Sequence, residues 1–356
     1  MAPKIRITYA VLVITSLLLA CTPQIQSSPG AAFYVYRFDP PAFVEFSVDS
    51  QPIQEIPFSV PPDCGLLDTY PAPIGKFLLI ELSCPNGQTV LFLDTKSGSA
   101  SQPVQDTDSH FLAWNGDGKS AYLKIDSLNN ARIVRMYTNG RFDELDLAGW
   151  TYDLSVKPNS DSFMFTSSRG LGSGSELNFS QNHGRSIEKL YADQLNYISF
   201  ARYSPDGSQI AFIKIPDSQT PFTVGELWLM NADGTNARKL ADADAGHGYA
   251  ANWSPDGSQI AFVKRENPDD ERANQLAEAL MSNIYLVNIP SGDMRQITHF
   301  TKGRAETPHW SPDGNTLAFN VVLDGRMDVQ IAELHSGQIR PLLTEAACCP
   351  AWIQNE

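Results

Sequence analysis

The sequence is poor in basic residues and lacks the short motifs that mark many catalytic and nucleotide-binding sites. It has 26 Lys and Arg against 40 Asp and Glu, a formal net charge of −14. A net-acidic chain without clusters of Lys or Arg has no sequence-independent attraction for nucleic acid. No His-Glu-x-x-His, Walker loop or Cys-x-x-Cys occurs. In the nearest match to a Gly-x-Ser-x-Gly elbow, Gly172 stands where the nucleophilic Ser would be. We therefore expect no nucleic-acid partner and none of these enzyme types.

Histidine is also scarce. The six His lie at positions 110, 183, 247, 299, 309 and 335, and no two of them have ligand spacing within one predicted element. A metal centre would need three or four ligands converging from separate segments. We therefore expect neither a metal nor a cofactor.

Long apolar runs are missing except at the N-terminus. Lys4 and Arg6 precede the apolar segment 7–20, which is short for a membrane span and has the form of a signal peptide. The ending Leu-Leu-Ala-Cys resembles a bacterial lipobox, so we expect lipidation of Cys21; an ordinary secretory signal is the alternative. The predicted organisation is a lipoprotein signal peptide at 1–20, a lipidated Cys and flexible tether at 21–31, and a folded region at 32–356. This predicts an exported protein, anchored by lipid to the outer face of the cytoplasmic membrane or to the outer membrane of a bacterium.

One phrase occurs three times in the folded region. Arg202–Phe212, Asn252–Phe262 and His309–Phe319 each place an aromatic residue before Ser-Pro-Asp-Gly and an apolar run after it. Pro presets φ, Asp hydrogen-bonds its own backbone, and Gly takes the positive-φ position. The phrase therefore predicts a strand, a turn and a second strand, in which the repeated Asp builds the turn rather than binding calcium.

Two further strands follow each phrase, so one repeat holds four short strands within about 40–45 residues, as propeller blades do. Weaker copies centre on Tyr70, Trp114 and Val156. Trp352 begins another copy, whose missing strands are predicted within residues 33–57. The sequence thus predicts an all-β fold, a β-propeller of seven four-stranded blades with a composite closing blade. The alternative is six blades with residues 33–57 packed outside.

The cysteines carry separate predictions. Cys64 and Cys84 lie opposite each other in a hairpin centred near Ile74, so a disulfide between them is possible. Disulfides persist in exported proteins. Cys348 and Cys349 are adjacent, and we expect free thiols there rather than a rare vicinal disulfide.

The three phrases, with their third and fourth strands, resemble the TolB-type propeller repeat, a relative of the WD repeat. The resemblance is strong over residues 197–356 and weak over 32–190, where Val156 replaces the aromatic residue and Asn115-Gly116 replaces Ser-Pro. It implies a platform for protein or peptide partners. Similar propellers precede the hydrolase domain of prolyl-oligopeptidase-like enzymes, but the chain leaves no room for such a domain, so we expect no enzyme activity.

Two features exceed what the repeat needs. The segment 268–282 has an apolar stripe at helical spacing and predicts a helix. The connections 242–248 and 298–306 are long polar loops on the same predicted face, and loops often carry function. These segments could equally pack on their own propeller or serve only as connections. The candidate binding rim comprises His247, Leu276, Leu280, His299, Lys302, Arg304 and Glu306.

Three functions remain open from the sequence. The leading one is a monomeric, membrane-tethered platform that binds a protein, peptide or glycan partner. A propeller enzyme of the lyase, lactonase or cyclase type, with a site at the central channel, is the alternative, and a structural envelope component is the third. Convergence of acids and His at the channel would favour an enzyme. The channel candidates are Asp68, His110, Arg202, Asn252, Glu306 and His309.

Overall fold

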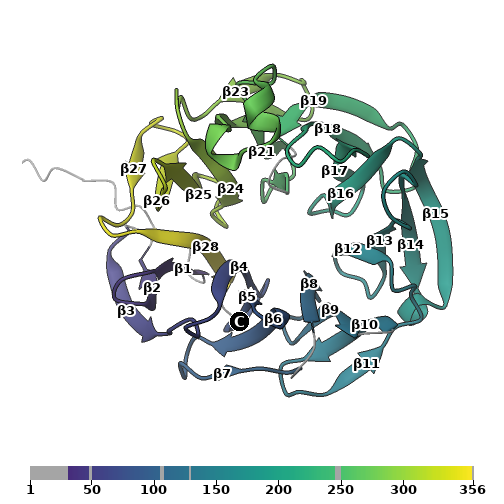
Figure 1. Ribbon diagram of the computed structural model, residues 1–356, viewed down its shortest axis with the longest axis horizontal. Coiled ribbons are helices and arrows are strands. Elements are labelled where there is room, and N and C mark those ends of the chain that lie inside the picture. Colours follow the sequence, from purple (N-terminus) through teal and green to yellow (C-terminus); the bar gives the residue numbers. More distant parts are fainter. Residues whose placement is uncertain (1–30, 48–49, 105–107, 128–129, 245–249, 355–356) are drawn as a thin grey trace, which may run out of the picture.

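The fold consists of antiparallel β-sheets arranged in a ring (Figure 1). The computed structural model describes residues 31–47, 50–104, 108–127, 130–244, 250–354. Figure 1 shows the first strand of each four-strand unit nearest the centre and the last strand at the periphery. No helix in this described part of the chain is long and apolar enough to cross a membrane. The predicted all-β propeller architecture is therefore present.

Five of the sheets have four strands and one has eight. The first sheet consists of β28 (Ala347–Gln354), β1 (Ala31–Arg37), β2 (Ala42–Phe46) and β3 (Pro52–Pro57). The second sheet consists of β4 (Gly65–Pro71), β5 (Phe77–Cys84), β6 (Gly87–Asp94) and β7 (Ala100–Ser101). The third sheet consists of β8 (Asp108–Trp114), β9 (Ser120–Ser127), β10 (Asn130–Tyr137) and β11 (Phe142–Glu144). The fourth sheet consists of β12 (Thr151–Val156), β13 (Phe163–Ser167), β14 (Ser175–Gln181) and β15 (Ser186–Asp193). The fifth sheet consists of β16 (Asn196–Tyr203), β17 (Gln209–Pro216), β18 (Val224–Asn231) and β19 (Arg238–Asp244). The eight-stranded sheet holds β20 (Asn252–Trp253), β21 (Gln259–Arg265), β22 (Ser282–Asn288), β23 (Met294–Gln296), β24 (Arg304–Trp310), β25 (Thr316–Leu323), β26 (Arg326–Glu333) and β27 (Ile339–Pro341).

The Ser-Pro-Asp-Gly turns form as the sequence predicts. In the turn between β16 and β17, the Ser204 hydroxyl donates to Asp206 Oδ1 at 2.6 Å, and the Ser208 amide donates to the same oxygen at 3.0 Å. Gly207 has a φ of 71°, which a residue with a Cβ rarely adopts. The Asp256 and Asp313 carboxylates accept the same hydrogen bonds in their own turns. These carboxylates build the turns.

The two ends of the folded region share one sheet. β28 pairs with β1 in antiparallel register, so that Phe33 lies opposite Trp352. The strands β1, β2 and β3 therefore belong to one sheet with β28, the last described strand. The first described strand, β1, begins at Ala31.

The hydrophobic core lies between neighbouring sheets. The Phe that ends each repeated phrase, Phe212, Phe262 or Phe319, is less than 2 % exposed. Phe212 packs with Met164 and Leu177 of the preceding sheet. An apolar side chain at this repeated position therefore joins one sheet to the next, and each such burial contributes about 1.5–3 kcal/mol.

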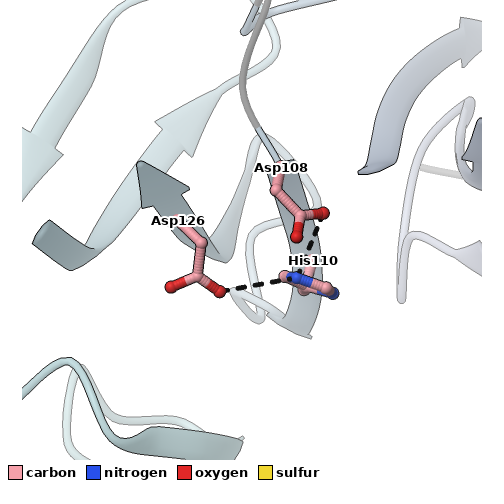
Figure 2. A group of neighbouring side chains, drawn as sticks. All are labelled: Asp108, His110 and Asp126. Carbon is pink, nitrogen blue, oxygen red and sulfur yellow. Dashed lines mark ion pairs between the residues drawn. The ribbon is translucent and has the colours of Figure 1, made fainter. Parts of the chain in front are cut away.

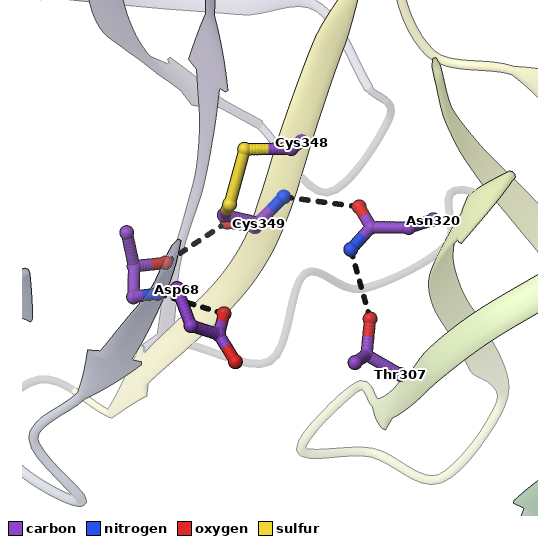
Figure 3. The surroundings of a disulfide bond; sticks show 6 residues. Asp68, Thr307, Asn320, Cys348 and Cys349 are labelled. Atoms are coloured by element: carbon purple, nitrogen blue, oxygen red, sulfur yellow. Dashed lines mark hydrogen bonds between the residues drawn. A yellow bond between two sulfur atoms is a disulfide. The ribbon is translucent and has the colours of Figure 1, made fainter. Parts of the chain in front are cut away.

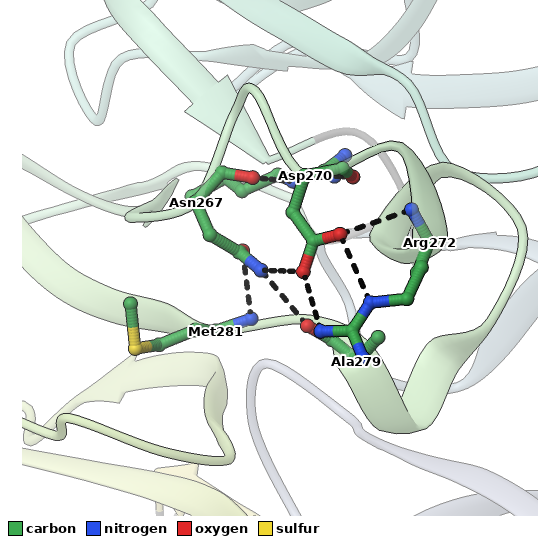
Figure 4. A network of polar contacts seen from close by, with 6 residues as sticks. Asn267, Asp270, Arg272, Ala279 and Met281 are labelled. Carbon is green, nitrogen blue, oxygen red and sulfur yellow. Dashed lines mark hydrogen bonds and ion pairs between the residues drawn. The ribbon is translucent and has the colours of Figure 1, made fainter.

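The predicted helix over 268–282 is wrong. The segment forms two 3₁₀ turns, η2 (Glu271–Asn274) and η3 (Ala277–Ala279), separated by extended backbone at Leu276. Side chains compete with helical hydrogen bonding here (Figure 4): Asn267 accepts from the Met281 amide at 3.1 Å and donates to the Ala279 carbonyl at 2.9 Å. These bonds tie the two ends of the insertion together and leave no room for a straight helix. A third 3₁₀ turn, η1, spans Asn182–Gly184.

The two cysteine predictions have opposite outcomes. The Cys64–Cys84 disulfide is present, as predicted. Cys348 and Cys349, expected as thiols, are joined in a vicinal disulfide (Figure 3), and that prediction is corrected. Cys349 has a φ of 64°, and its amide donates to the Asn320 side chain at 3.0 Å. The prediction of free thiols depended on how rarely vicinal disulfides occur. That frequency does not describe the backbone conformation at Cys348 and Cys349.

Candidate functional site

A cavity of about 940 Å³ lies among the innermost strands. It extends from the middle of these strands to the turns that follow β8 and β12, so it reaches the face of the molecule formed by the strand-connecting turns. Its volume is in the range of small-molecule and cofactor pockets. The side chains that could recognise a ligand are Asp68, Tyr70, Phe111, Tyr152, Asp153, Phe200, Arg202, Asn252, Thr307 and His309.

Asp68 is the most perturbed acid of the cavity. Burial raises the pKa of its carboxyl to about 7, and the nearby charges of Glu81 and Glu306 act in the same direction. The Thr69 amide donates to Asp68 Oδ1 at 2.7 Å and partly offsets this effect (Figure 3). A carboxyl group that titrates near neutral pH in a pocket can exchange a proton with a ligand.

An aromatic pair lines the wall beside Asp68. The rings of Tyr70 and Phe111 stack with centroids 4.1 Å apart. The Tyr70 hydroxyl donates to Glu81 Oε2 at 3.0 Å, and Glu81 is buried, which raises the pKa of its carboxyl. The pair thus offers an apolar surface whose orientation is fixed by a polar contact behind it.

The ion pair between Arg202 and Asp153 is a second polar element of the cavity lining. Arg202 donates to Asp153 Oδ1 at 2.8 Å, and the Ala201 amide donates to Asp153 Oδ2 at 3.0 Å. Asp153 is 8 % exposed, whereas about a third of the Arg202 side chain is accessible. The ion pair therefore holds a guanidinium in place at the cavity surface, where it can bind an anionic group.

His309 and Asn252 complete the polar lining. Burial lowers the pKa of His309 to about 4, so its imidazole is neutral at pH 7. Asn252 donates to the Pro308 carbonyl at 2.7 Å, which fixes the orientation of its amide. Both groups are uncharged and suit hydrogen bonding more than charge recognition.

The channel candidates separate into three locations. Asp68, Arg202, Asn252 and His309 line the cavity together. Glu306 is buried, near enough to influence Asp68, and forms an ion pair with Arg304. His110 lies elsewhere, between Asp108 and Asp126 (Figure 2). Among the described residues this last set is the only group of three His, Cys, Asp or Glu at metal-binding separation, and none of its members lines the cavity.

The candidate rim is only partly available to a partner. His299 and Lys302 are exposed, and Leu276 is 48 % exposed. Leu280 is 1 % exposed and belongs to the core. His247 lies outside the described residues.

The other two rim candidates support the fold. Arg304 donates to the Ala277 carbonyl at 3.1 Å and pairs with the buried Glu306. This pair anchors the 3₁₀ turn η3 to β24. A partner contact at this rim would therefore depend on the three exposed side chains.

Several residues that line the cavity were not predicted from the sequence. Tyr152 and Asp153 lie in the weakest repeat, just before Val156, where the aromatic landmark is missing. Tyr152 donates to the Ile198 carbonyl at 2.6 Å, and burial raises its pKa to about 12. Tyr152 and Asp153 are adjacent, yet both line the cavity, and the pairing of β12 with β13 shifts register between Thr151 and Asp153. Regular alternation along a strand would assign only one of them to the cavity.

The arrangement of sheets around a central cavity defines the class of protein as a β-propeller. Neither protein-family models nor curated proteins match the sequence. The structure is similar to TolB from Acinetobacter baumannii, with 16 % identity over 89 % of this chain and 79 % of that chain and a TM-score of 0.51. The chain has a TolB-like β-propeller fold.

Propellers of enzymes are also similar in structure. A prolyl endopeptidase matches 90 % of this chain but 49 % of its own length, with 10 % identity and a TM-score of 0.62. An oligogalacturonate lyase in complex with manganese matches 87 % of this chain and 84 % of its own length, with 15 % identity and a TM-score of 0.57. At these identities the similarity concerns the fold alone, so function has to be inferred from the cavity.

Proposed function

We propose that this chain is an exported, membrane-tethered propeller that binds a protein, peptide or glycan partner, and that the central cavity holds a short segment of that partner. The observation that carries the proposal is the mixed lining of the cavity. It combines the stacked Tyr70–Phe111 face with the Arg202–Asp153 ion pair and the fixed amide of Asn252. Aromatic and Arg side chains in such pockets supply most of the binding energy at interfaces.

The uncharged His309 and the partly protonated Asp68 favour a hydrogen-bonding ligand. Near pH 7 the inner part of the cavity presents the Arg202 guanidinium paired to Asp153, the neutral imidazole of His309 and the partly protonated carboxyl group of Asp68. Further charged side chains line the cavity: Asp117, Arg135, Lys157 and Asp161. A peptide segment or a glycan offers hydroxyl, amide or carboxylate groups for these partners. The stacked aromatic pair offers a flat apolar surface to a sugar ring or an apolar side chain.

An enzyme remains the second candidate, favoured by one observation. Asp68, with a pKa of about 7, is suited to donate or accept a proton in the cavity. The described residues that line the cavity include no group of three His, Cys, Asp or Glu at metal-binding separation. In such a reaction Asp68 would transfer the proton, and the Arg202 guanidinium would bind an anionic group of the substrate.

The rim is proposed as a second contact surface for a larger partner. Leu276, His299 and Lys302 supply its exposed side chains. Lys302 pairs with the exposed Asp324 at 2.9 Å, an interaction that a partner carboxylate could replace at little cost.

The tether and the blade count are part of the same proposal. Cys21 lies outside the described residues and is proposed to carry lipid; a Cys21→Ala protein is expected to leave the membrane fraction. β22 and β24 share one pairing, Ser282 with Arg304, so we count the eight-stranded sheet as two blades and the ring as seven.

Site-specific photo-crosslinking in cells tests the proposed cavity. A benzophenone amino acid is placed at Phe111 or Phe200 in the cavity, at Leu276 on the rim, and at Ile187 on the outer strand β15 as a control. The proposal expects the same adduct from both cavity positions and none from Ile187. Adducts from Ile187 alone, or from no position, would contradict it.

A further inference from the structure

Asp108, His110 and Asp126 form a compact cluster at one end of β8 and β9 (Figure 2). Asp108 and Asp126 are direct partners across the two strands, and His110 follows Asp108 by two residues, so all three side chains lie on one face. His110 Nε2 is 3.4 Å from Asp108 Oδ1 and 3.5 Å from Asp126 Oδ2. Two carboxylates directly opposite each other repel, so this pairing requires compensation.

The orientation of the imidazole points to a cation at the centre of the cluster. His110 Nδ1 lies 2.6 Å from Gln88 Oε1, so Nδ1 carries the hydrogen and donates to this oxygen. The other ring nitrogen, Nε2, then faces both carboxylates. A metal-binding His characteristically donates its other ring N–H to an oxygen in this way.

The other charged side chains nearby do not neutralise the negative charge of the cluster. Lys124 Nζ is 3.0 Å from Asp126 Oδ2 and compensates one carboxylate. Glu81 Oε1 lies 3.9 Å from His110 Nδ1 on the other side of the ring and adds negative charge. The surroundings of the imidazole therefore remain net negative.

The backbone holds Asp108 in place before any ion binds. The Gln88 amide donates to Asp108 Oδ1 at 2.6 Å. This approach requires Gly87, because a Cβ at that position would lie 2.9 Å from the same oxygen, and Gly87 has a φ of 119°. The neighbouring Cys64–Cys84 disulfide fixes the same hairpin, since Cys84 pairs with Gly87.

We propose that Asp108, His110 and Asp126 bind one divalent transition-metal ion, Mn²⁺ or Zn²⁺. Ligand atoms about 2.1 Å from a common ion lie roughly 3.0–3.4 Å apart. The distances of 3.4 and 3.5 Å from His110 Nε2 to the two carboxylates are close to this range, and all three ligand atoms lie within 4.8 Å of one another. An imidazole ligand disfavours Mg²⁺ and Ca²⁺, which select oxygen. The three side chains are 29–39 % exposed, so an ion can enter and water or a carboxylate of a ligand can take the remaining positions.

The site is separate from the cavity and adds to the proposed function without depending on it. Its ligands come from β8 and β9, whereas Gln88 belongs to β6 of the preceding sheet. A bound ion would therefore stabilise the contact between these two sheets.

The test is calorimetric titration of MnCl₂ and ZnCl₂ into the purified full chain, untagged and freed of metal with a chelator. We expect one ion bound per chain and a melting temperature raised by saturating metal. His110→Gln and Asp126→Asn should abolish this binding, and Gln88→Ala should weaken it about 10–100-fold. His299→Gln, which alters an exposed His elsewhere, is the matched control and should bind as the parent does.

The chelator-treated variants should melt within a few degrees of the chelator-treated parent, which separates loss of metal from loss of fold. Absence of stoichiometric binding by the parent, or parental affinity in His110→Gln, would overturn the proposal.

Discussion

Phe33 of β1 and Trp352 of β28 stack their rings, with centroids 4.1 Å apart and an interplanar angle of 18°. The two residues lie at opposite ends of the folded region and face each other in the strand register. Phe33 is 1 % exposed and packs with Val35, Phe46 and Ala347. This contact joins the two ends of the folded region within one sheet.

Truncation of Phe33 should therefore destabilise the whole protein. Phe33→Ala is expected to lower the free energy of unfolding by about 3–5 kcal/mol, as for other buried Phe residues. Urea denaturation followed by circular dichroism measures the change. Trp150→Ala, at a residue 50 % exposed, is the control and should cost far less.

Deletion of residues 346–356 should be at least as damaging as Phe33→Ala, and a truncated protein that unfolds like the parent would contradict the composite sheet.

The Cys64–Cys84 disulfide should make a measurable contribution to stability. It closes a loop with a sequence separation of 20. Constraint of the unfolded chain by a loop of this length contributes about 3 kcal/mol. The double variant Cys64→Ser/Cys84→Ser is expected to lose about this amount of unfolding free energy in urea without reductant. A loss below about 0.5 kcal/mol would show that the bond adds nothing to the native hairpin.

Asp68 should make stability depend on pH in a defined direction. Its pKa is about 7 in the folded protein and near 3.8 in the unfolded chain, so the folded state binds the proton more tightly. Its contribution is therefore most favourable below about pH 4 and is lost as the pH rises toward 7. Relative to the parent, Asp68→Asn should gain melting temperature between pH 4 and pH 8. A constant difference across this range would contradict the raised pKa.

The turn carboxylates should matter for stability and not for calcium. Asp256 accepts from the Ser254 hydroxyl at 2.6 Å and from the Ser258 amide at 3.0 Å. Asp256→Ala is expected to cost about 1 kcal/mol, measured by thermal or urea unfolding. Gln259→Ala, three residues on, should change stability by less than about 0.5 kcal/mol. Destabilisation of the parent by a calcium-specific chelator, equal to that in Asp256→Ala, would indicate a metal role instead.

The rim should be tested at its exposed residues. Leu280→Asp would place a carboxylate in the core, so it is unsuitable for a binding test. Leu276→Asp with Lys302→Ala is expected to lower capture of the crosslinked partner several-fold with unchanged melting temperature. Changes at Gln259 and Asn315, beside the opposite turns, form the control pair. Loss of capture only with the control pair would place the partner on the other face.

The sequence predicted the fold well because the repeat determines local structure. Ser-Pro-Asp-Gly fixes turns through side chain and backbone chemistry, and the strand register follows from them. The same logic located the partner of Cys64. It failed for 268–282, where Asn267 binds backbone groups 12 and 14 residues away and replaces helical bonds. Such long-range side-chain contacts are not visible in an apolar periodicity.

The site was predicted only in part for a related reason. Their places in the predicted first strands made Asp68, Arg202, Asn252 and His309 channel candidates, and the structure brings them to one cavity. The sequence did not identify Asp153, because that residue acquires its role from Arg202 on a different sheet. The cluster around His110 likewise depends on the pairing of β8 with β9, which places Asp108 opposite Asp126, 18 positions further along the chain.

The most direct test of the central claim is the fate of the ligand captured by the cavity. The crosslinked segment is identified, synthesised without the crosslink, and incubated with the parent protein and with Asp68→Asn. A binding propeller should retain the ligand at one equivalent and release it chemically unchanged, and both proteins should bind it in calorimetry with dissociation constants within about tenfold. Conversion of the ligand by the parent, with loss of conversion in Asp68→Asn, would contradict the binding account and establish an enzyme.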